Sequence, residues 1–572
     1  MTESERSAEQ VVKGGSLVLI SGLLAGTVGW IWGVLASRSD IGFGAAGFGI
    51  VSMANSVVIS MMAIAGGLHQ SFSKKISESL VTSDELALKY SRAGFRISHL
   101  FGFVFFIPLF ILSIFLFMNQ DSLMGAIVLT IAIAIYLAFF RDNFIGTLGG
   151  IQRFDLIATV NFMAMVGSIS IGFIILFLVP PPENATLALI TVITGPILQI
   201  FVEFLFLKKD LPFSLKSSII GETDKNIIIE TLKYGLYCAL PMIILNGSIY
   251  TLQTLFYSLF FRPGPAIPIP ALQQLSSFLF PESNIIGISA IFIGYAGIMN
   301  AVAVMAWPLV PALSEAKAIT ESTTASEEEK SKNELLIDDY VKSSFKTGFN
   351  LTSFFIIIYV GLSYSLLYLL HGPEYTAGYI PFIIQCVAVA FTSIDFLISA
   401  VLMGLGEGRK AAISIGTLLG ANIILIPLFI ILFKTNNPNN ALYAGPIALL
   451  LAAGVILIIT FHYLTKLTRN PRNYYLSVLG KGSLSAAIAI LISFFIDKFL
   501  YPYHQNILSF LLGGIILGVS YLFIMLFLAG YDEDDIKLME NIGPLSGFAK
   551  MARSIIRHSP FYKEKEDKST KT

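Results

Sequence analysis

Cysteine and charged side chains are scarce in this sequence. Its 572 residues include only two cysteines, Cys238 and Cys386, and both lie in apolar runs, so no disulfide framework and no cysteine metal site is predicted. Charged residues make up 13% of the chain, whereas an average soluble domain has about 25%. So few charges cannot cover the surface of a soluble fold of this length. This excludes an ordinary cytosolic enzyme and a disordered chain.

Signals for other classes of protein are also missing. The 37 Lys and Arg residues equal the 37 Asp and Glu residues in number. The basic excess typical of a nucleic-acid-binding protein is therefore absent, and no nucleic acid is expected as a partner. The sequence has no G-x-x-x-x-G-K-[ST] motif and no H-E-x-x-H motif, so neither an ATP-driven pump nor a metal site is predicted. Because the outer loops are short, we expect no enzymatic activity and no bound cofactor.

Long apolar segments are abundant. Hydrophobic residues make up 55% of the chain, and the mean hydropathy is +0.76. A helix needs about 20 mainly apolar residues to cross the roughly 30 Å hydrocarbon core, because it rises 1.5 Å per residue. We predict an all-α polytopic membrane protein with about 14 transmembrane helices. The apolar runs lie at 14–36, 46–69, 97–118, 122–141, 156–179, 186–207, 233–260, 285–310, 347–370, 378–404, 410–433, 441–464, 481–500 and 507–530.

The distribution of Lys and Arg predicts the orientation. If the N-terminus is cytoplasmic, all but four of these residues lie in cytoplasmic segments, as the positive-inside rule requires. The exceptions are Arg38, Arg262, Lys434 and Lys498. We predict a multi-pass plasma-membrane protein with both termini in the cytoplasm.

The order of the apolar runs divides the chain into four parts. We predict an N-terminal six-helix lobe at 1–210, a C-terminal six-helix lobe at 211–465, two further helices at 466–530 and a cytoplasmic tail at 531–572. The segment 317–340 is rich in Ser, Thr and Glu, which is typical of a linker. The proline-rich outer loop 262–284 indicates an extended excursion over the outer surface, and we assign it no role.

Carboxyl groups inside the predicted helices are candidate functional residues, because a charge at the membrane centre costs about 2.5–3.5 kcal/mol on insertion scales. Asp395 in the tenth helix is the clearest example. It is either a cation or proton site, or a carboxyl group bonded to neighbouring Ser and Thr residues. Glu203 lies near the inner end of the sixth helix and is expected to reach toward Lys208 and Lys209.

Other polar residues of the predicted helices have two interpretations each. Arg141, at the inner end of the fourth helix, either pairs locally with Asp142 or binds substrate. Asn55 and Asn246 either line a hydrated interior or bridge helices.

Two glycine-rich inner turns indicate an internal repeat. One follows the fourth helix and the other follows the tenth, and an alignment pairs Gly150 with Gly406 and Arg153 with Arg409. The two six-helix lobes are then repeats with parallel topology. Substrate sites in such folds lie between the repeats, near the middle of the membrane.

Four short segments, in the same order along the chain, resemble landmarks of a transporter family. They are 38–42 with 47–50 between the first two helices, 149–154 after the fourth, 308–316 at the end of the eighth, and 371–376 before the tenth. Through them the chain resembles the polysaccharide transporter and oligosaccharide flippase branch of the multidrug/oligosaccharidyl-lipid/polysaccharide (MOP) exporter superfamily. The resemblance implies two six-helix bundles around a central cavity that opens alternately to the two membrane faces. Asp40-Ile41 and the long loop 262–284 depart from the family pattern.

The resemblance implies a flippase that moves polyprenyl-(pyro)phosphate-linked oligosaccharide from the cytoplasmic to the outer face, for surface polysaccharide or glycoprotein glycan assembly. Expected partners are lipid-linked oligosaccharide, membrane lipids and glycan-assembly enzymes. The membrane potential favours outward movement of an anion by about 2.3 kcal/mol per charge per 100 mV, and Na⁺ or H⁺ coupling at Asp395 is a further source of energy. Arg38 also suits a structural role in its turn. Candidate cations for the headgroup are Lys13, Arg38, Arg141 and Arg262, with Arg153 and Arg409 at the inner turns.

Two alternative functions stay open on the sequence. One is a multidrug-type cation-coupled antiporter, although the first predicted helix lacks the acidic residue that is frequent in that branch. The other is a non-transporting scaffold of a glycan-assembly complex. Loss of the protein would cause drug sensitivity in the first case and failed complex assembly in the second.

Overall fold

The computed structural model describes residues 21, 24, 27–29, 31–38, 40–80, 83–151, 153–179, 186–210, 221–245, 248–261, 285–304, 309–321, 326–434, 437–468, 472–500, 502–528, 530–531, 552–556 and 558. Nearly all of these residues are helical, and none of them belongs to a strand. The all-α prediction is therefore confirmed for this part of the chain.

Ten of the described helices are long and apolar enough to cross a membrane. They coincide with the second to sixth and the tenth to fourteenth predicted runs, and this supports a multi-pass membrane protein. A bent pair joins α14 (Glu327–Gly361) to α15 (Ser363–Leu366) and the π-helical turn η1 (Leu367–His371) at an angle of 74°, and counts as an eleventh candidate span if it crosses as one unit. The ten are α2 (Gly44–Leu80), α3 (Asp84–Met118), α4 (Ser122–Gly150), α5 (Phe154–Leu178), α7 (Ile190–Asp210), α16 (Tyr379–Gly404), α17 (Gly408–Lys434), α18 (Ala444–Leu467), α19 (Arg472–Phe495) and α20 (Ile507–Phe527).

The other three predicted runs fall partly outside the described residues. The first run includes the short apolar helix Thr27–Ser37. The run at 233–260 holds α9 (Lys225–Leu245) and α10 (Ser248–Phe260), and the run at 285–310 holds most of α12 (Ile285–Val304). The total of fourteen therefore stays a prediction.

The segment 317–340 is helical over most of its described length, and its role as a linker stays a prediction. α13 (Leu309–Glu321) extends into this segment, and α14 begins directly after Ser326. The Glu329 backbone N–H donates to Ser326 Oγ at 3.2 Å, and the Ser326 N–H donates to the Glu329 carboxylate at 2.9 Å. This capping box and three Glu residues in the first turn stabilise the positive end of the helix dipole. The Glu run therefore marks a helix N-terminus.

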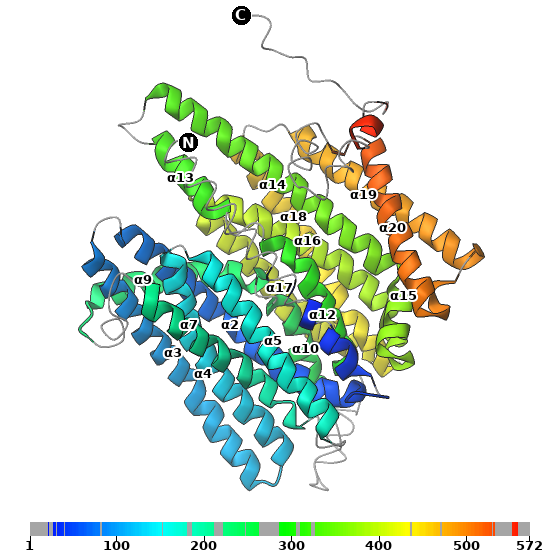
Figure 1. Cartoon of the computed structure of the whole chain (residues 1–572), viewed down its shortest axis with the longest axis horizontal. Helices are drawn as coiled ribbons and strands as arrows, with labels where there is room; N and C mark the ends of the chain where they lie inside the picture. Colours follow the sequence, from blue (N-terminus) through cyan, green and yellow to red (C-terminus); the bar gives the residue numbers. More distant parts are fainter. Residues whose placement is uncertain are drawn as a thin grey trace, which may run out of the picture.

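The described helices form two groups with separate hydrophobic cores (Figure 1). One core lies among α2, α3, α4 and the adjoining parts of α5 and α7. The other lies among α10, α12, α14, α16, α17 and α18. Among the described helices, extensive packing between the groups is made by α9, α10 and α12 against α2, and by α9 against α3.

α19 and α20 pack against each other and against α14, at the outer side of the second group (Figure 1). The packing is close at two glycines. A Cβ added at Gly482 would lie 2.5 Å from the Phe349 ring, and one added at Gly361 would lie 2.8 Å from Leu517. These two helices therefore extend the second group sideways.

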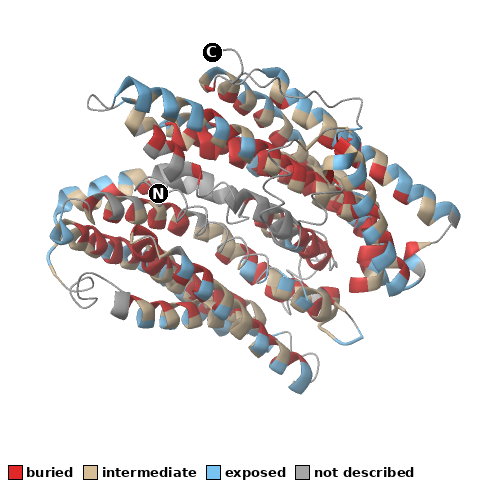
Figure 2. Cartoon of the chain, turned by 45° about the horizontal axis from the view of Figure 1, so that its top comes forward, coloured by how far each residue is buried: buried red, intermediate tan, exposed pale blue. Residues whose placement is uncertain are grey.

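The outward faces of the helices are apolar. Figure 2 shows buried residues along the faces between helices and exposed residues along the outer surface. On α3 the exposed side chains include Leu100, Phe103, Ile107, Ile111 and Phe115. Lipid tails match such a surface, whereas in water it would be an aggregation site.

Candidate functional site

The two helix groups meet, at the end that the Lys and Arg distribution predicts to face outward, in a set of hydrogen bonds. We call this set the outer junction, and it is made by Ser37, Arg38, Tyr295, His371 and Tyr375. Ser37 Oγ lies 2.6 Å from His371 Nδ1, and His371 Nε2 lies 3.0 Å from the Tyr295 hydroxyl. The Tyr375 hydroxyl donates to the Ser37 carbonyl oxygen at 3.0 Å. Ser37, His371 and Tyr375 are buried. The junction therefore joins two of the family-like segments, which are more than 300 residues apart.

The hydrogen bonds of the outer junction assign the imidazole tautomer. The Ser37 hydroxyl donates to the Val34 carbonyl oxygen at 3.1 Å, so it accepts from His371 Nδ1–H. His371 Nε2 then accepts from the Tyr295 hydroxyl. A neutral imidazole therefore completes the chain of donors and acceptors.

Close backbone packing between α2 and α12 closes the same end of the molecule. A Cβ added at Gly287 would lie 2.1 Å from the Ala45 carbonyl oxygen, so only glycine fits there. Gly49, one turn further along α2, also lies against the start of α12, where its added Cβ would be 3.4 Å from the Gly287 nitrogen. The two helix ends are in direct backbone contact.

Arg38 belongs to the outer junction through its whole guanidinium group. Its Nε and one terminal nitrogen donate to the Asp40 carboxylate at 2.7 and 2.6 Å, and the other terminal nitrogen donates to the Leu369 carbonyl oxygen at 3.1 Å. In this conformation the predicted headgroup cation is thus engaged by protein groups. This geometry fits the structural role in its turn.

Asp40→Asn is expected to remove a part of stability that depends on pH. The Arg38 hydrogen bonds and charge lower the pKa of the Asp40 carboxyl below its ordinary value of 3.8. The stabilisation is therefore complete above that value and is lost as pH falls through the lowered pKa. For an exposed ion pair, we expect the wild type to exceed the variant in free energy of unfolding by about 0.2–1 kcal/mol near neutral pH. This difference should become smaller below about pH 4. Thermal unfolding of the wild type and of Asp40→Asn between neutral pH and acid checks this prediction. A stability difference that becomes larger in acid would contradict it.

A polar seam lies buried among α10, α16 and α18. We define it as Tyr250, Gln253, Gln385, Thr392, Asp395 and Thr460. The Tyr250 hydroxyl lies 2.7 Å from Thr392 Oγ1, and Gln253 Nε2 donates to Gln385 Oε1 at 3.0 Å. Tyr250 and Gln253 are three residues apart and therefore share one face of α10.

Asp395 is the charged residue of the polar seam, and it is fully buried. Its Oδ1 accepts a hydrogen bond from Thr460 Oγ1 of α18 at 2.9 Å, whereas its Oδ2 has no hydrogen-bond partner among the residues that the structure describes. The sequence predicted a hydrogen bond to a neighbouring Ser or Thr of the same helix. The observed donor is instead Thr460, on a different helix. A buried acceptor without a partner is costly, and a proton or a small cation on Oδ2 would relieve that cost.

A second buried polar cluster lies in the first helix group, among His69 of α2, Arg141 and Asp142 of α4, and Glu203 of α7. Arg141 Nε donates to Asp142 Oδ1 at 2.7 Å, and a terminal nitrogen of Arg141 donates to the same oxygen. The local Arg141–Asp142 pair is therefore present. Glu203 is fully buried, has Arg141 and Asp142 as charged neighbours, and does not extend to the membrane surface. The prediction that the Glu203 side chain reaches toward the membrane surface near Lys208 and Lys209 is therefore wrong.

Glu203→Leu is expected to raise the stability of the protein. Among the described residues neither carboxyl oxygen of Glu203 makes a hydrogen bond of good geometry, although the Gln199 amide lies nearby. Removing a buried unsatisfied polar group relieves about 1–3 kcal/mol. Glu203→Gln is the matched control, because it keeps the volume and still buries an amide. Thermal unfolding in detergent compares the variants. A lower thermal-unfolding midpoint for Glu203→Leu than for the wild type would contradict the prediction, because it would mean that the carboxyl group stabilises the folded protein.

The two inner turns share a hydrogen-bond pattern in a different register from the predicted one. The Arg153 N–H donates to the Leu148 carbonyl oxygen at 3.0 Å, and the Glu407 N–H donates to the Leu402 carbonyl oxygen at 2.7 Å. Arg153 is thus equivalent to Glu407, and its predicted pairing with Arg409 is wrong by two residues. The repeated turn itself is present.

The side chains at these inner turns are held locally. Arg153 pairs with Asp155 through two hydrogen bonds of 3.0 Å. In the second turn Glu407 pairs with Lys410 at 3.0 Å, and Arg409 is exposed in the first turn of α17. Lys317 of α13 donates to the Leu405 carbonyl oxygen at 2.6 Å and thereby caps α16.

The structure places the remaining predicted residues as follows. Asn55 is exposed in the middle of α2, between the buried residues Ala54 and Ser56. Lys13, Arg262 and Asn246 lie outside the described residues, so their roles stay predictions.

Three functional candidates were not visible to sequence reasoning: His69, His371 and Thr460. Each contacts or faces a residue of another helix that is distant in sequence, as with Thr460 and Asp395, 65 residues apart. His371 had one available signal, because it begins a family-like segment at the outer end of a predicted helix.

No family model matches the chain, and no curated protein matches it. Several solved structures do. The inward-facing conformation of a multidrug resistance MATE family transporter of the MOP superfamily aligns with a TM-score of 0.55 at 15% identity, over 79% of this chain and 98% of that chain. The lipid II flippase MurJ in its inward closed conformation aligns with a TM-score of 0.54 at 18% identity, over 89% of this chain and 97% of that chain.

The chain has the MOP transporter fold. The superfamily-level expectation from the four sequence segments is thereby confirmed for the fold. The same fold is found in a multidrug transporter and in a lipid II flippase, so the fold does not distinguish these two functions. The flippase alignment includes a larger share of this chain than the multidrug alignment does.

Proposed function

We propose that this protein is a flippase that moves oligosaccharide linked to a polyprenyl phosphate or pyrophosphate from the cytoplasmic to the outer face of the plasma membrane. The observation that carries the proposal is the unequal contact between the helix groups. The outer junction and the α2–α12 contact hold one end together (Figure 1). At the other end α9 packs on α2, where Lys75 pairs with Glu230 at 2.6 Å, whereas the described parts of α13 and α14 make no extensive contact with α2 to α7. Looser contact at one end is what a protein that opens its two ends alternately requires.

The proposed lobes, 1–210 and 211–465, move against each other around a central polar cavity. A glycan cannot cross lipid unaided, because each unpaired hydroxyl costs about 4–8 kcal/mol in a medium that cannot form hydrogen bonds. Asn55, which is exposed on α2, is a proposed contact for the polar substrate. Lys13, Arg262 and Asn246 are the other proposed contacts for the glycan and its anionic headgroup, and the lipid tail stays in the bilayer.

The proposed energy source is the membrane potential, with Na⁺ or H⁺ coupling at Asp395. Outward movement of each negative charge gains about 2.3 kcal/mol per 100 mV in an inside-negative membrane. Asp395 supports coupling because it is buried and keeps one oxygen without a hydrogen-bond partner. The glycan-assembly enzymes that build and use the lipid-linked oligosaccharide are the proposed partners.

The test locates lipid-linked saccharides after depletion of the protein. A membrane-impermeant glycan probe is applied to sealed vesicles of known sidedness, with cells that re-express the wild-type chain as the control. We expect lipid-linked saccharide to accumulate on the cytoplasmic face and re-expression to reverse it. An unchanged distribution together with failed assembly of a glycan-synthesis complex would support the scaffold function instead.

A multidrug antiporter is the second candidate function. The MATE alignment and the two buried carboxyl groups, Glu203 and Asp395, favour it. It predicts that depletion raises cellular accumulation of cationic drugs and leaves lipid-linked saccharides in place. The two functions therefore give opposite results in the same pair of assays.

A further inference from the structure

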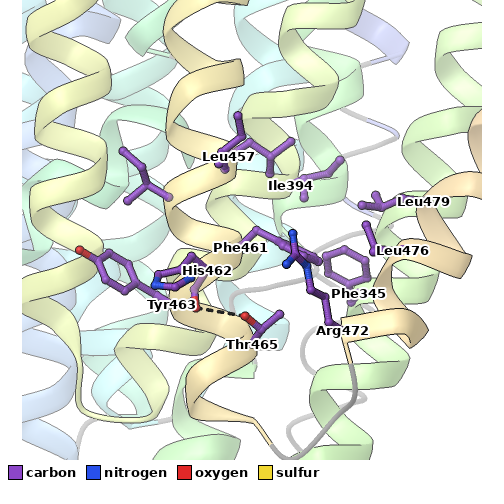
Figure 3. Close-up of a pocket in the computed structure, with 12 residues that line it drawn as sticks. Phe345, Ile394, Leu457, Phe461, His462, Tyr463, Thr465, Arg472, Leu476 and Leu479 are labelled. Carbon is purple, nitrogen blue, oxygen red and sulfur yellow. Dashed lines mark hydrogen bonds between the residues drawn. The ribbon is translucent and has the colours of Figure 1, made fainter.

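We propose that the pocket among α14, α16, α18 and α19 binds one anionic phospholipid of the inner leaflet. The pocket has a volume of about 570 Å³. It lies in the second helix group, beside the ends of α18 and α19 that the Lys and Arg distribution places at the cytoplasmic face (Figure 3). It is separate from the outer junction and from the proposed substrate contacts.

The deep part of the pocket is apolar and suits an acyl chain. Its lining includes Phe345 of α14, Ile394 of α16, Leu457 of α18 and Leu479 of α19. Leu457 lies ten residues before the inner end of α18, so the pocket reaches about 15 Å from that end. This depth matches one leaflet of a hydrocarbon core of about 30 Å.

The pocket opens toward the lipid. Ile458 and Leu476, at its edge, are 74% and 47% exposed, although both are large apolar residues. A lipid in the surrounding leaflet can therefore insert its chain from the side. An apolar edge at this depth favours an occupant with a hydrocarbon chain.

The inner mouth of the pocket carries a cation. Arg472 begins α19, and Figure 3 shows its side chain extending into the pocket beside Phe345 and Phe461. Within the part of the chain that the structure describes, no carboxylate forms an ion pair with Arg472. A planar guanidinium group binds phosphate through two parallel hydrogen bonds. His462 and Thr465 add polar groups at the same mouth.

Charge complementarity therefore selects the occupant. An apolar slot one leaflet deep, with an arginine at headgroup level, matches a lipid whose phosphate carries a net negative charge. A zwitterionic lipid fits the slot equally well but supplies a choline that the arginine repels. The occupant would pack against α16 and α18, whose Asp395–Thr460 hydrogen bond lies next to the lining residues Ile394 and Phe461.

The experiment measures retained lipid by native mass spectrometry of the purified full chain. The protein is incubated with phosphatidylglycerol, phosphatidylcholine or a polyprenyl phosphate, each at the same concentration. We expect phosphatidylglycerol to be retained in preference to phosphatidylcholine, and Arg472→Gln to reduce its retention about tenfold, as expected for loss of a charge-assisted bidentate contact. Leu476→Trp, which narrows the lipid-facing edge of the pocket, is expected to reduce retention of both phospholipids.

Lys466→Gln is the matched control, because Lys466 is an exposed cation at the same end of α18 that does not line the pocket. It should leave phosphatidylglycerol retention unchanged. Equal losses in Lys466→Gln and Arg472→Gln would overturn the proposal in favour of diffuse attraction to the surface. Retention of polyprenyl phosphate but not of phosphatidylglycerol would overturn the choice of occupant.

Discussion

Gly287→Ala is expected to open the outer end of the molecule and to lower its stability. The added Cβ would lie 2.1 Å from the Ala45 carbonyl oxygen, and backbone cannot rotate away as a side chain can. Overpacking of this kind costs about 1–3 kcal/mol, which corresponds to roughly a 5- to 150-fold shift away from the closed outer end. We expect this loss of stability even though the helix propensity of Ala exceeds that of Gly by about 0.8–1.0 kcal/mol.

The same helix offers a matched control for this variant. Gly294 has no atom within 4 Å of its added Cβ, so Gly294→Ala should gain the helix propensity without a clash. Spin labels at two exposed outer positions, Ile41 and Ala377, report the distance across the junction in a cysteine-free background. A longer label distance and a lower unfolding midpoint are expected for Gly287→Ala alone. Identical behaviour of the two variants would exclude the α2–α12 contact as the closing element.

Asp395→Asn is expected to remove the ion dependence of transport and to retain the fold. Asn keeps the shape of Asp and still accepts the Thr460 hydrogen bond, but it cannot bind or release a proton and holds a cation poorly. Coupling between two ligands is typically about 5- to 150-fold in affinity, and a loss of this size is expected. Transport into proteoliposomes, with and without a Na⁺ or pH gradient, measures it.

Two variants separate coupling from packing at this position. Thr460→Val removes the hydrogen bond to Asp395 Oδ1 and should weaken ion dependence in the same direction. Ser399→Ala removes another buried hydroxyl of α16 that has no hydrogen-bond partner, so it should leave ion dependence unchanged. If Asp395→Asn transports with the ion dependence of the wild type, Asp395 has no coupling role.

The membrane class and most crossing helices were predictable because hydrophobic burial in lipid depends on composition over about 20 residues. Ten described helices coincide with predicted runs for this reason. The extension of α14 before its apolar part was missed, since an exposed polar helix has no hydropathy signal. Its N-terminus was nevertheless encoded locally, by Ser326 and Glu329 at capping-box spacing.

The site was less predictable than the fold because its contacts join distant parts of the chain. Asp395 was recognisable as a buried carboxyl group, but its donor, Thr460, follows from how α16 packs on α18. Arg38 was recognisable as an unusual outer cation, whereas its partner, the Leu369 carbonyl oxygen, depends on the bend after α14. The predicted alignment of the two inner turns was wrong by two residues because it matched glycines, whereas the equivalent positions are defined by the backbone hydrogen bonds.

The length of α14 has a mechanical consequence. Its 35 residues span about 50 Å, whereas the hydrocarbon core is about 30 Å thick, so the Glu-rich first turns stand clear of the membrane. At the other end the chain bends by 74° and continues into His371. Because such a helix is stiff, a small tilt at its Glu-rich end also displaces its other end, near His371. A displacement of the Glu-rich end of α14 is thereby coupled to the outer junction through one continuous helix and its bend.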